Sequence, residues 1–197
     1  ADGYTLLVGN VSTNAINESV FKSLQIKPSR DLTGVTNLIE LPHFFTASTA
    51  VPGATLQQFF DHVRKTGARY NYASAGVGSY PHLDAARLLK VAGIEMTHVP
   101  YKGGAGQMLP AIIGNEVQFM HINMASSIPH IRAGRIKPLA TTWPTRRPEL
   151  PEVQTMAESG FPGFDMSAWF GLFAPQGTPR EIITRLQESA VKALSMA

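Results

Sequence analysis

The sequence contains no cysteine, which excludes a disulfide scaffold and any metal site built on thiolates. Charged residues are also scarce, at 16% of the chain, against roughly 25% in an average protein. The 17 Lys and Arg outnumber the 14 Asp and Glu, and the resulting net charge of +3 is too small to indicate a polyanionic partner by itself. No apolar run approaches the roughly 20 residues of a membrane-spanning helix.

The start of the chain lacks the charged and then apolar segments of a leader, so we expect that a signal peptide is not part of this chain. Asp2-Gly3 predicts a turn ahead of a buried strand at 6–8. With 197 residues, 44% of them hydrophobic, the chain is long enough for a substantial core and allows one domain or two small ones.

Short apolar runs alternate with amphipathic stretches along the rest of the sequence. Strands are predicted at 35–41, 44–47, 70–74, 96–99, 117–120, 138–141 and 166–173. Helices are predicted up to residue 24, at 55–67, 82–91 and 108–113, briefly before 133, and after 178. Residues 143–162 are rich in proline and are expected to be mostly irregular. This alternation of strand and helix predicts an α/β fold with a largely parallel sheet.

Two helix starts carry a capping box, in which a Thr is followed three residues later by Gln or Glu. The first is Thr55 with Gln58, and the second is Thr178 with Glu181, which also has Pro179 at the expected first helical position. After Thr55 in the sequence, apolar side chains recur at helical spacing, which predicts a buried helix face that includes Phe59.

Ligand sites in parallel sheets lie beyond the carboxyl ends of the strands, where strand-to-helix loops meet. Three such loops are small, polar or rich in glycine, at 9–14, 74–80 and 121–127, and we expect them to share one sheet edge; the loop at 102–106 is a fourth candidate. Their backbone N–H groups and hydroxyls, next to helix N-termini, favour a carboxylate or phosphate without needing Lys or Arg. The alternative is that the glycines only make tight turns.

Other chemistries lack their signatures. The sequence Gly76-Val77-Gly78 has no third glycine for a dinucleotide fingerprint, and Lys102 precedes its glycines instead of following them as in a phosphate-binding P-loop. The six histidines show no metal-ligand spacing, and no nucleophile motif Gly-x-Ser-x-Gly occurs. The basic stretch 130–147 lacks interleaved aromatics apart from Trp143. We therefore expect no cofactor, no metal, no catalytic residues and no nucleic-acid partner.

Six strings in this order resemble one known family. They are Asp2-Gly3-Tyr4-Thr5-Leu6-Leu7, Asn71-Tyr72-Ala73-Ser74-Ala75-Gly76, Pro81-His82-Leu83, His98-Val99-Pro100-Tyr101-Lys102-Gly103, Pro129-His130-Ile131-Arg132-Ala133-Gly134 and Trp169-Phe170-Gly171-Leu172-Phe173-Ala174-Pro175. The chain resembles, over essentially its whole length, the Bug family of TctC-type substrate-binding receptors of tripartite tricarboxylate transporters.

The resemblance implies a type II periplasmic binding protein, with two α/β lobes, a hinge and a ligand cleft. It also implies that lobe 1 is incomplete in this chain, without the family's first strand–loop–helix units and its C-terminal end. A partial domain 1 would comprise 1–40 and 165–197, and domain 2 would comprise 41–164. The hinge would lie near Leu38–Pro42 and Ser167–Phe170.

Members of this family hold a ligand carboxylate with backbone and hydroxyl groups of strand-to-helix loops. Carried over by position, the ligand-binding residues would be Ser12, Thr13, Asn14, Ser74, Ala75, Gly78, Ser79 and Asn123. Many members have Phe-Asp-Asn where this chain has His121-Ile122-Asn123, and the missing Asp favours a plain mono- or dicarboxylate or an aromatic acid over an amino acid.

The resemblance therefore implies a periplasmic, non-enzymatic receptor that captures a small organic carboxylate for membrane permease subunits. A second hypothesis is a ligand-sensing protein that presents its bound lobe to a signalling partner. An enzyme ranks third.

Overall fold

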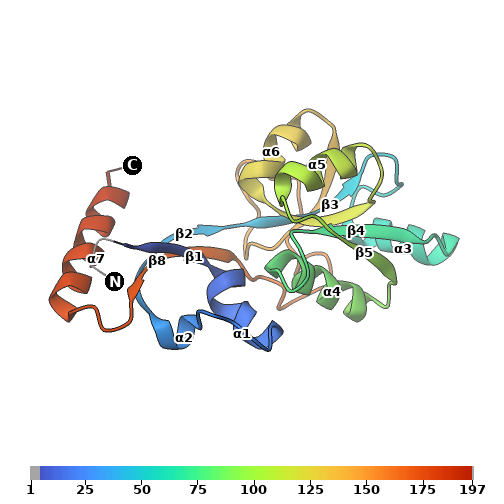
Figure 1. The fold of residues 1–197 in the computed structure, drawn as a ribbon. Helices are drawn as coiled ribbons and strands as arrows, with labels where there is room; N and C mark the ends of the chain where they lie inside the picture. Colours follow the sequence, from blue (N-terminus) through green and yellow to red (C-terminus); the bar gives the residue numbers. More distant parts are fainter. Residues whose placement is uncertain (1–4, 197) are drawn as a thin grey trace. The chain divides into compact units, whose positions relative to one another are not determined.

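The computed structural model describes residues 5–196, and the Asp2-Gly3 turn lies outside them. The chain divides into two compact units, one made of residues 1–40 and 168–197 and the other of residues 41–167. Figure 1 shows their elements along the chain. The larger unit carries most of the loops that the sequence analysis selected.

The smaller unit contains β1 (Leu7–Asn10), η1 (Ser12–Ile16), α1 (Asn17–Val20), α2 (Pro28–Asp31), β2 (Leu32–Leu41, whose last residue enters the larger unit), β8 (Ala168–Pro175) and α7 (Arg180–Leu194). Its three strands are ordered β1-β8-β2, and β1 runs antiparallel to β8. This antiparallel pair corrects the expectation of a largely parallel sheet, because β1 and β8 meet through long-range pairing that no local signal encodes.

The second predicted capping box is wrong. Helix α7 begins at Arg180 with Pro179 in the N-cap position, so the proline lies one place earlier than predicted. The Thr178 hydroxyl donates instead to the Pro175 carbonyl at 2.7 Å, which ties it to the preceding turn.

The larger unit contains β3 (His43–Ser48), α3 (Leu56–Thr66), β4 (Tyr70–Ser74), α4 (Tyr80–Ala92), β5 (Met96–Pro100), α5 (Ala105–Ile113), β6 (Phe119–Asn123), α6 (Met124–Arg132) and β7 (Ile136–Thr141). Its sheet has the order β5-β4-β6-β3-β7. Strand β4 is parallel to β5 and β6, whereas β3 is antiparallel to β6 and β7. The α/β fold class is confirmed, with one antiparallel strand placed inside the sheet.

Helices pack against both faces of this sheet (Figure 1). On one face, α3 and α4 bury an aromatic core that contains Phe45, Phe59 and Phe119. On the other face, α5 buries residues such as Met108 and Ile112. Within β6, successive side chains alternate between these two cores, as strand geometry requires. The region 143–162, which was predicted to be irregular, contains one isolated parallel bridge, in which Thr155 pairs with Thr141 just before the region.

Helix α3 confirms the first capping box and the predicted apolar face. The Thr55 hydroxyl accepts the Gln58 N–H at 3.3 Å, and Gly67 ends the helix in the left-handed conformation. The Gln58 side chain accepts the N–H of Ala54, one residue before the N-cap, at 2.9 Å. Phe59 is fully buried and stacks on Phe119 with 5.4 Å between the ring centroids.

We predict that Phe59→Ala lowers the free energy of unfolding by about 3–5 kcal/mol, because it leaves a cavity in a densely packed aromatic core. Chemical denaturation monitored by circular dichroism measures the change. Lys65→Ala, an exposed position on the same helix, is the control and should be nearly neutral. A neutral Phe59→Ala would contradict the central place of this ring in the core.

Candidate functional site

The candidate site lies at one edge of the five-stranded sheet, where β4, β5 and β6 all end. Because β4 is parallel to both neighbours, the ends of all three strands, Ser74, Pro100 and Asn123, lie at the same edge. Helix α4 begins six residues after β4, at Tyr80, and α6 begins directly after β6, at Met124. Two helix N-termini, each with a partial positive charge, therefore adjoin neighbouring strands.

The segment 121–127, predicted as a loop, is instead the end of β6 followed by the first turn of α6. Asn123 is the N-cap of that helix, and its side-chain oxygen accepts the Ser126 N–H at 2.8 Å. Asn is a strong N-cap residue, so a helix start at this point was readable from the sequence.

Loop 75–79 folds around two hydroxyls and one carbonyl. The Ser74 hydroxyl is fully buried; its oxygen accepts the Gly76 N–H at 3.1 Å and lies 2.6 Å from Nε2 of His98. The Ser79 hydroxyl donates to the Gly76 carbonyl at 2.7 Å and, among the described contacts, makes no helix-capping bond. Both hydroxyls therefore shape the loop from inside. Ala75 is exposed at its surface.

The backbone of this loop also depends on glycine and a histidine. Gly78 is buried with φ of +78°, a conformation that L side chains rarely adopt. Its N–H donates to Nδ1 of His82, in the first turn of α4, at 3.1 Å. Gly76, with φ of +121°, faces open space where a side chain would begin. The loop therefore presents bare backbone to the surroundings.

The predicted residues Ser12, Thr13 and Asn14 lie elsewhere, in the π-helical turn η1 that follows β1. The Asn10 side-chain oxygen accepts the N–H of Ser12 at 2.9 Å and of Thr13 at 3.1 Å. Strand β1 belongs to the three-stranded sheet, so the expectation that loop 9–14 shares a sheet edge with 74–80 is wrong. The fourth candidate loop, 102–106, turns into α5, and the Gly103 N–H donates to the Gln107 side chain at 3.0 Å.

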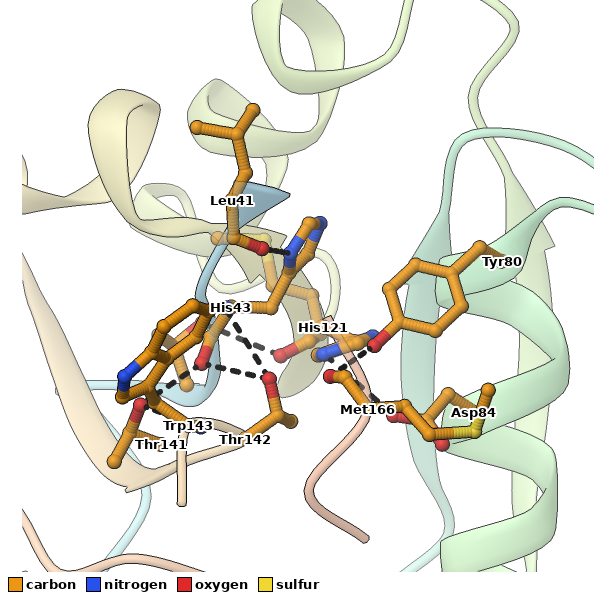
Figure 2. A network of polar contacts seen from close by, with 11 residues as sticks. Leu41, His43, Tyr80, Asp84, His121, Thr141, Thr142, Trp143 and Met166 are labelled. Carbon is orange, nitrogen blue, oxygen red and sulfur yellow. Dashed lines mark hydrogen bonds and ion pairs between the residues drawn. The ribbon is translucent and has the colours of Figure 1, made fainter. Parts of the chain in front are cut away.

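A buried polar cluster that the sequence analysis missed lies beside the loop (Figure 2). His121 of β6 is completely buried and packs against Phe45 with 4.4 Å between ring centroids. Its Nε2 lies 3.6 Å from Oδ2 of Asp84 on α4. Within the described part of the chain, neither ring nitrogen of His121 nor this carboxyl oxygen has a hydrogen-bond partner. Such groups are costly to bury, so their placement constrains their charge.

The cluster also holds both ends of the larger unit's chain. Nδ1 of His43 lies 3.1 Å from the Leu41 carbonyl, at the start of the unit, and the Tyr80 hydroxyl donates to the Met166 carbonyl at 2.8 Å, near its end. Figure 2 shows these side chains converging on His121. One sequence signal could have revealed the cluster: Asp84 shares a helical stripe with the buried Leu88 and Ala92.

Burial sets the protonation of these groups. It raises the pKa of the Asp84 carboxyl to about 6 and lowers the pKa of His43 to about 4. Burial, with His43 nearby, lowers the pKa of His121 well below its usual value. Uncharged forms are favoured in all three, because a low-dielectric interior penalises charge.

We predict that Asp84→Asn changes how stability depends on pH. A raised carboxyl pKa contributes stability that is present below its ordinary value near 4 and is lost as the pH rises through about 6. The variant removes this loss, so it should be more stable than the parent at pH 8, by up to about 3 kcal/mol for a shift of about two units.

Thermal melts between pH 4 and pH 8 measure this effect, with Asp165→Asn, which removes an exposed carboxyl, as the control. If the parent's decline in melting temperature between pH 4 and pH 6 persists unchanged in Asp84→Asn, Asp84 is not its source.

A groove of about 610 Å³ lies at the opposite end of the same sheet, where β4 and β5 begin and α4 ends. Its lining is a mixture of charged, aromatic and apolar residues that includes Arg69, Lys90 and Glu95. It lies away from the helix N-termini and from the polar loops. Among the described residues, no group of His, Asp and Glu is arranged to hold a metal ion, and no helix is long and apolar enough to cross a membrane.

Comparisons with known proteins agree on one family. The family model described as the tripartite tricarboxylate transporter family receptor, TctC, matches residues 1–197. The "UPF0065 protein in tcbD-tcbE intergenic region" of Pseudomonas sp. strain P51 is 32% identical over 99% of this chain and 58% of its own length. Protein BugT of Bordetella pertussis is 31% identical over 98% of this chain and 60% of its own length. The chain therefore spans about three fifths of these relatives.

Solved structures show the same fold. A structure described as a periplasmic transporter superposes with a TM-score of 0.91 at 34% identity, covering 98% of this chain and 64% of that one. An R. palustris protein with adipate superposes with a TM-score of 0.89 at 32% identity, over 96% and 63%. MatC from Rhodopseudomonas palustris, with bound malate, superposes with a TM-score of 0.86 at 34% identity, over 98% and 65%. The fold is that of the periplasmic binding proteins.

Proposed function

Because this chain belongs to the tripartite tricarboxylate transporter receptor family, we propose that it captures a small organic carboxylate in the periplasm and delivers it to membrane permease subunits. The family and its solved neighbours are substrate-binding proteins and not enzymes. Two of these neighbours are described with the dicarboxylates adipate and malate.

The observation that carries the proposal is the sheet edge formed by β4, β5 and β6. Two helices begin there, α4 and α6, and the loop before α4 presents bare glycine backbone. Backbone N–H groups and helix N-termini bind anions without Lys or Arg, and a carboxylate suits them in charge and size.

The proposed ligand residues are the eight named from the sequence, and the contacts suggest different roles for them. Ser74 and Gly78 use their polar groups inside the loop and would act as its framework. Ala75 would offer its backbone to the ligand, and Ser79 would reach it by turning its hydroxyl away from the Gly76 carbonyl. Asn123 would orient the start of α6. The remaining three proposed ligand residues, Ser12, Thr13 and Asn14, belong to the turn η1 of the smaller unit.

In this proposal the two units are the lobes of a type II binding protein. The chain crosses between them near Leu38–Pro42 and Ser167–Phe170, in extended segments that could act as a hinge.

Binding is tested by thermal shift and calorimetry with malate and adipate, using the dimethyl esters of both acids as uncharged controls. A ligand at about 100 times its dissociation constant should stabilise the protein by roughly 2.7 kcal/mol, and the esters should not. A shift with ATP alone, or a melting temperature that falls on adding a chelator, would contradict a carboxylate receptor.

We predict that Ser79→Ala weakens the binding of malate or adipate about tenfold. The reason is that the Ser79 hydroxyl, which donates to the Gly76 carbonyl in the ligand-free loop, would turn its proton to the carboxylate, and such charge-assisted bonds are worth roughly 1.5–3 kcal/mol. The ligand-free melting temperature should change little. Ser189→Ala, which removes a hydroxyl bonded to its own helix backbone in α7, is the matched control. Unchanged affinity with a lowered melting temperature would make Ser79 purely structural.

A further inference from the structure

Two histidines from different elements converge under loop 75–79. His82 lies in the first turn of α4 and His98 lies on β5, and their rings stack with centroids 4.0 Å apart and an interplanar angle of 26°. The Tyr72 ring of β4 continues the stack, 4.9 Å from the His98 ring. Each histidine touches the loop through a different polar contact. The two rings therefore contact each other, and each also contacts the loop.

The contact with Gly78 fixes the protonation of His82. A backbone N–H can only donate, so Nδ1 of His82, 3.1 Å away, must accept with its lone pair. His82 is then uncharged and carries its proton on Nε2. A proton added at Nδ1 would replace this acceptor with a second donor facing the Gly78 N–H. The left-handed backbone of Gly78 would lose the bond that anchors it.

His98 anchors the other end of the loop. Its Nε2 lies 2.6 Å from the buried Ser74 hydroxyl, whose oxygen also accepts the Gly76 N–H. Charging both histidines would place two cations face to face at 4.0 Å, where like charges repel strongly in a partly buried site. The stacked arrangement therefore tolerates at most one charge, and the Gly78 bond requires that His82 has none.

We propose that His82 and His98 are positioning residues that hold loop 74–79 in its ligand-accepting shape as an uncharged pair, and that protonation in acid releases the loop. The proposal rests on the carboxylate-binding role given to this loop. It adds that pH regulates binding: ligand affinity should be high near neutral pH and should fall in acid by more than protonation of the ligand explains.

The surroundings of the pair favour the uncharged state. The titratable groups that face it are Tyr72 and the two rings themselves, while Asp84, two residues after His82, faces His121. Burial, with His82 nearby, lowers the pKa of His98 to about 4, and burial lowers the pKa of His82. A lowered histidine pKa makes the folded loop most stable above the ordinary value near 6.5 and less stable as the pH falls below it.

The first experiment needs no ligand. Nitrogen-15 NMR of the ring nitrogens at pH 7 should show His82 with an unprotonated Nδ1 and a protonated Nε2. Amide hydrogen exchange at Gly78 should be slow in the parent and at least tenfold faster, relative to the intrinsic rate, in His82→Ala. A protonated Nδ1 in His82, or an unchanged Gly78 exchange rate in His82→Ala, would overturn the proposal even if carboxylates bind.

The second experiment uses substitutions that keep the hydrogen bonds but cannot titrate. His82→Asn can present its amide oxygen near the position of Nδ1, and His98→Gln can present its amide near Nε2. The double variant should bind malate or adipate within about threefold of the parent at pH 7 and should lose the excess weakening between pH 7 and pH 4.5. His82→Ala should bind at least tenfold more weakly at pH 7.

His130→Asn, which removes a histidine in the last turn of α6, is the matched control and should keep the parent's pH profile. The proposal is overturned if the double variant weakens in acid as the parent does. If neither malate nor adipate binds the parent, the carboxylate function fails, and the NMR and exchange results still decide whether the histidine pair holds the loop.

Discussion

The parallel pairing of β4 with both β5 and β6 is the constraint on which the rest of the candidate site depends. It aligns Ser74 with Pro100 and brings the end of β6 to the same edge. The loop before α4 and the N-cap of α6 are far apart in sequence, and this pairing is what brings them to the same edge. The aromatic core beneath the sheet, where Phe119 of β6 stacks between Phe45 and Phe59, stabilises the alignment through buried apolar surface.

At this edge, several polar groups form hydrogen bonds within the protein. The hydroxyls of Ser74 and Ser79 and the N–H of Gly78 all bond within the loop or to histidines. These bonds reduce the conformational freedom of the free loop, so that less entropy remains to be lost when a ligand binds. The polar side chains thus preorganise a backbone surface, and the backbone itself is suited to meet an anion.

The buried cluster of His121 and Asp84 has the opposite character, because its polar atoms are poorly satisfied. It lies where the larger unit's chain enters and leaves, beside Leu41 and Met166. Unpaired buried polar groups are tolerated when something else is gained, most often at functional or moving parts of a protein. Two side chains of this cluster, His43 and Tyr80, bond to the segments where the chain enters and leaves the larger unit, so the cost of burial falls at these two crossings.

The elements formed by local signals could be predicted from the sequence. Helix α3 has its capping residue, its apolar stripe and its terminal glycine within thirteen residues, and β4 has the predicted bounds 70–74. The family could also be predicted, because six strings occur in order between residues 2 and 175. Signals that compete locally were misread: Thr178 bonds to the preceding turn and not to the α7 backbone.

What only the tertiary structure decided is which groups meet. The sequence shows six histidines but not their partners. Contacts between separate elements decide that His82 accepts from Gly78, that His98 contacts Ser74 and that His121 faces Asp84. The same holds for β1, which pairs with β8 more than 150 residues away in place of the strands nearest to it in sequence. Local propensity acts over a few residues, whereas strand order and side-chain pairing come from burying the whole apolar surface at once. A sequence can therefore identify the loops of a site before it can say which atoms hold them.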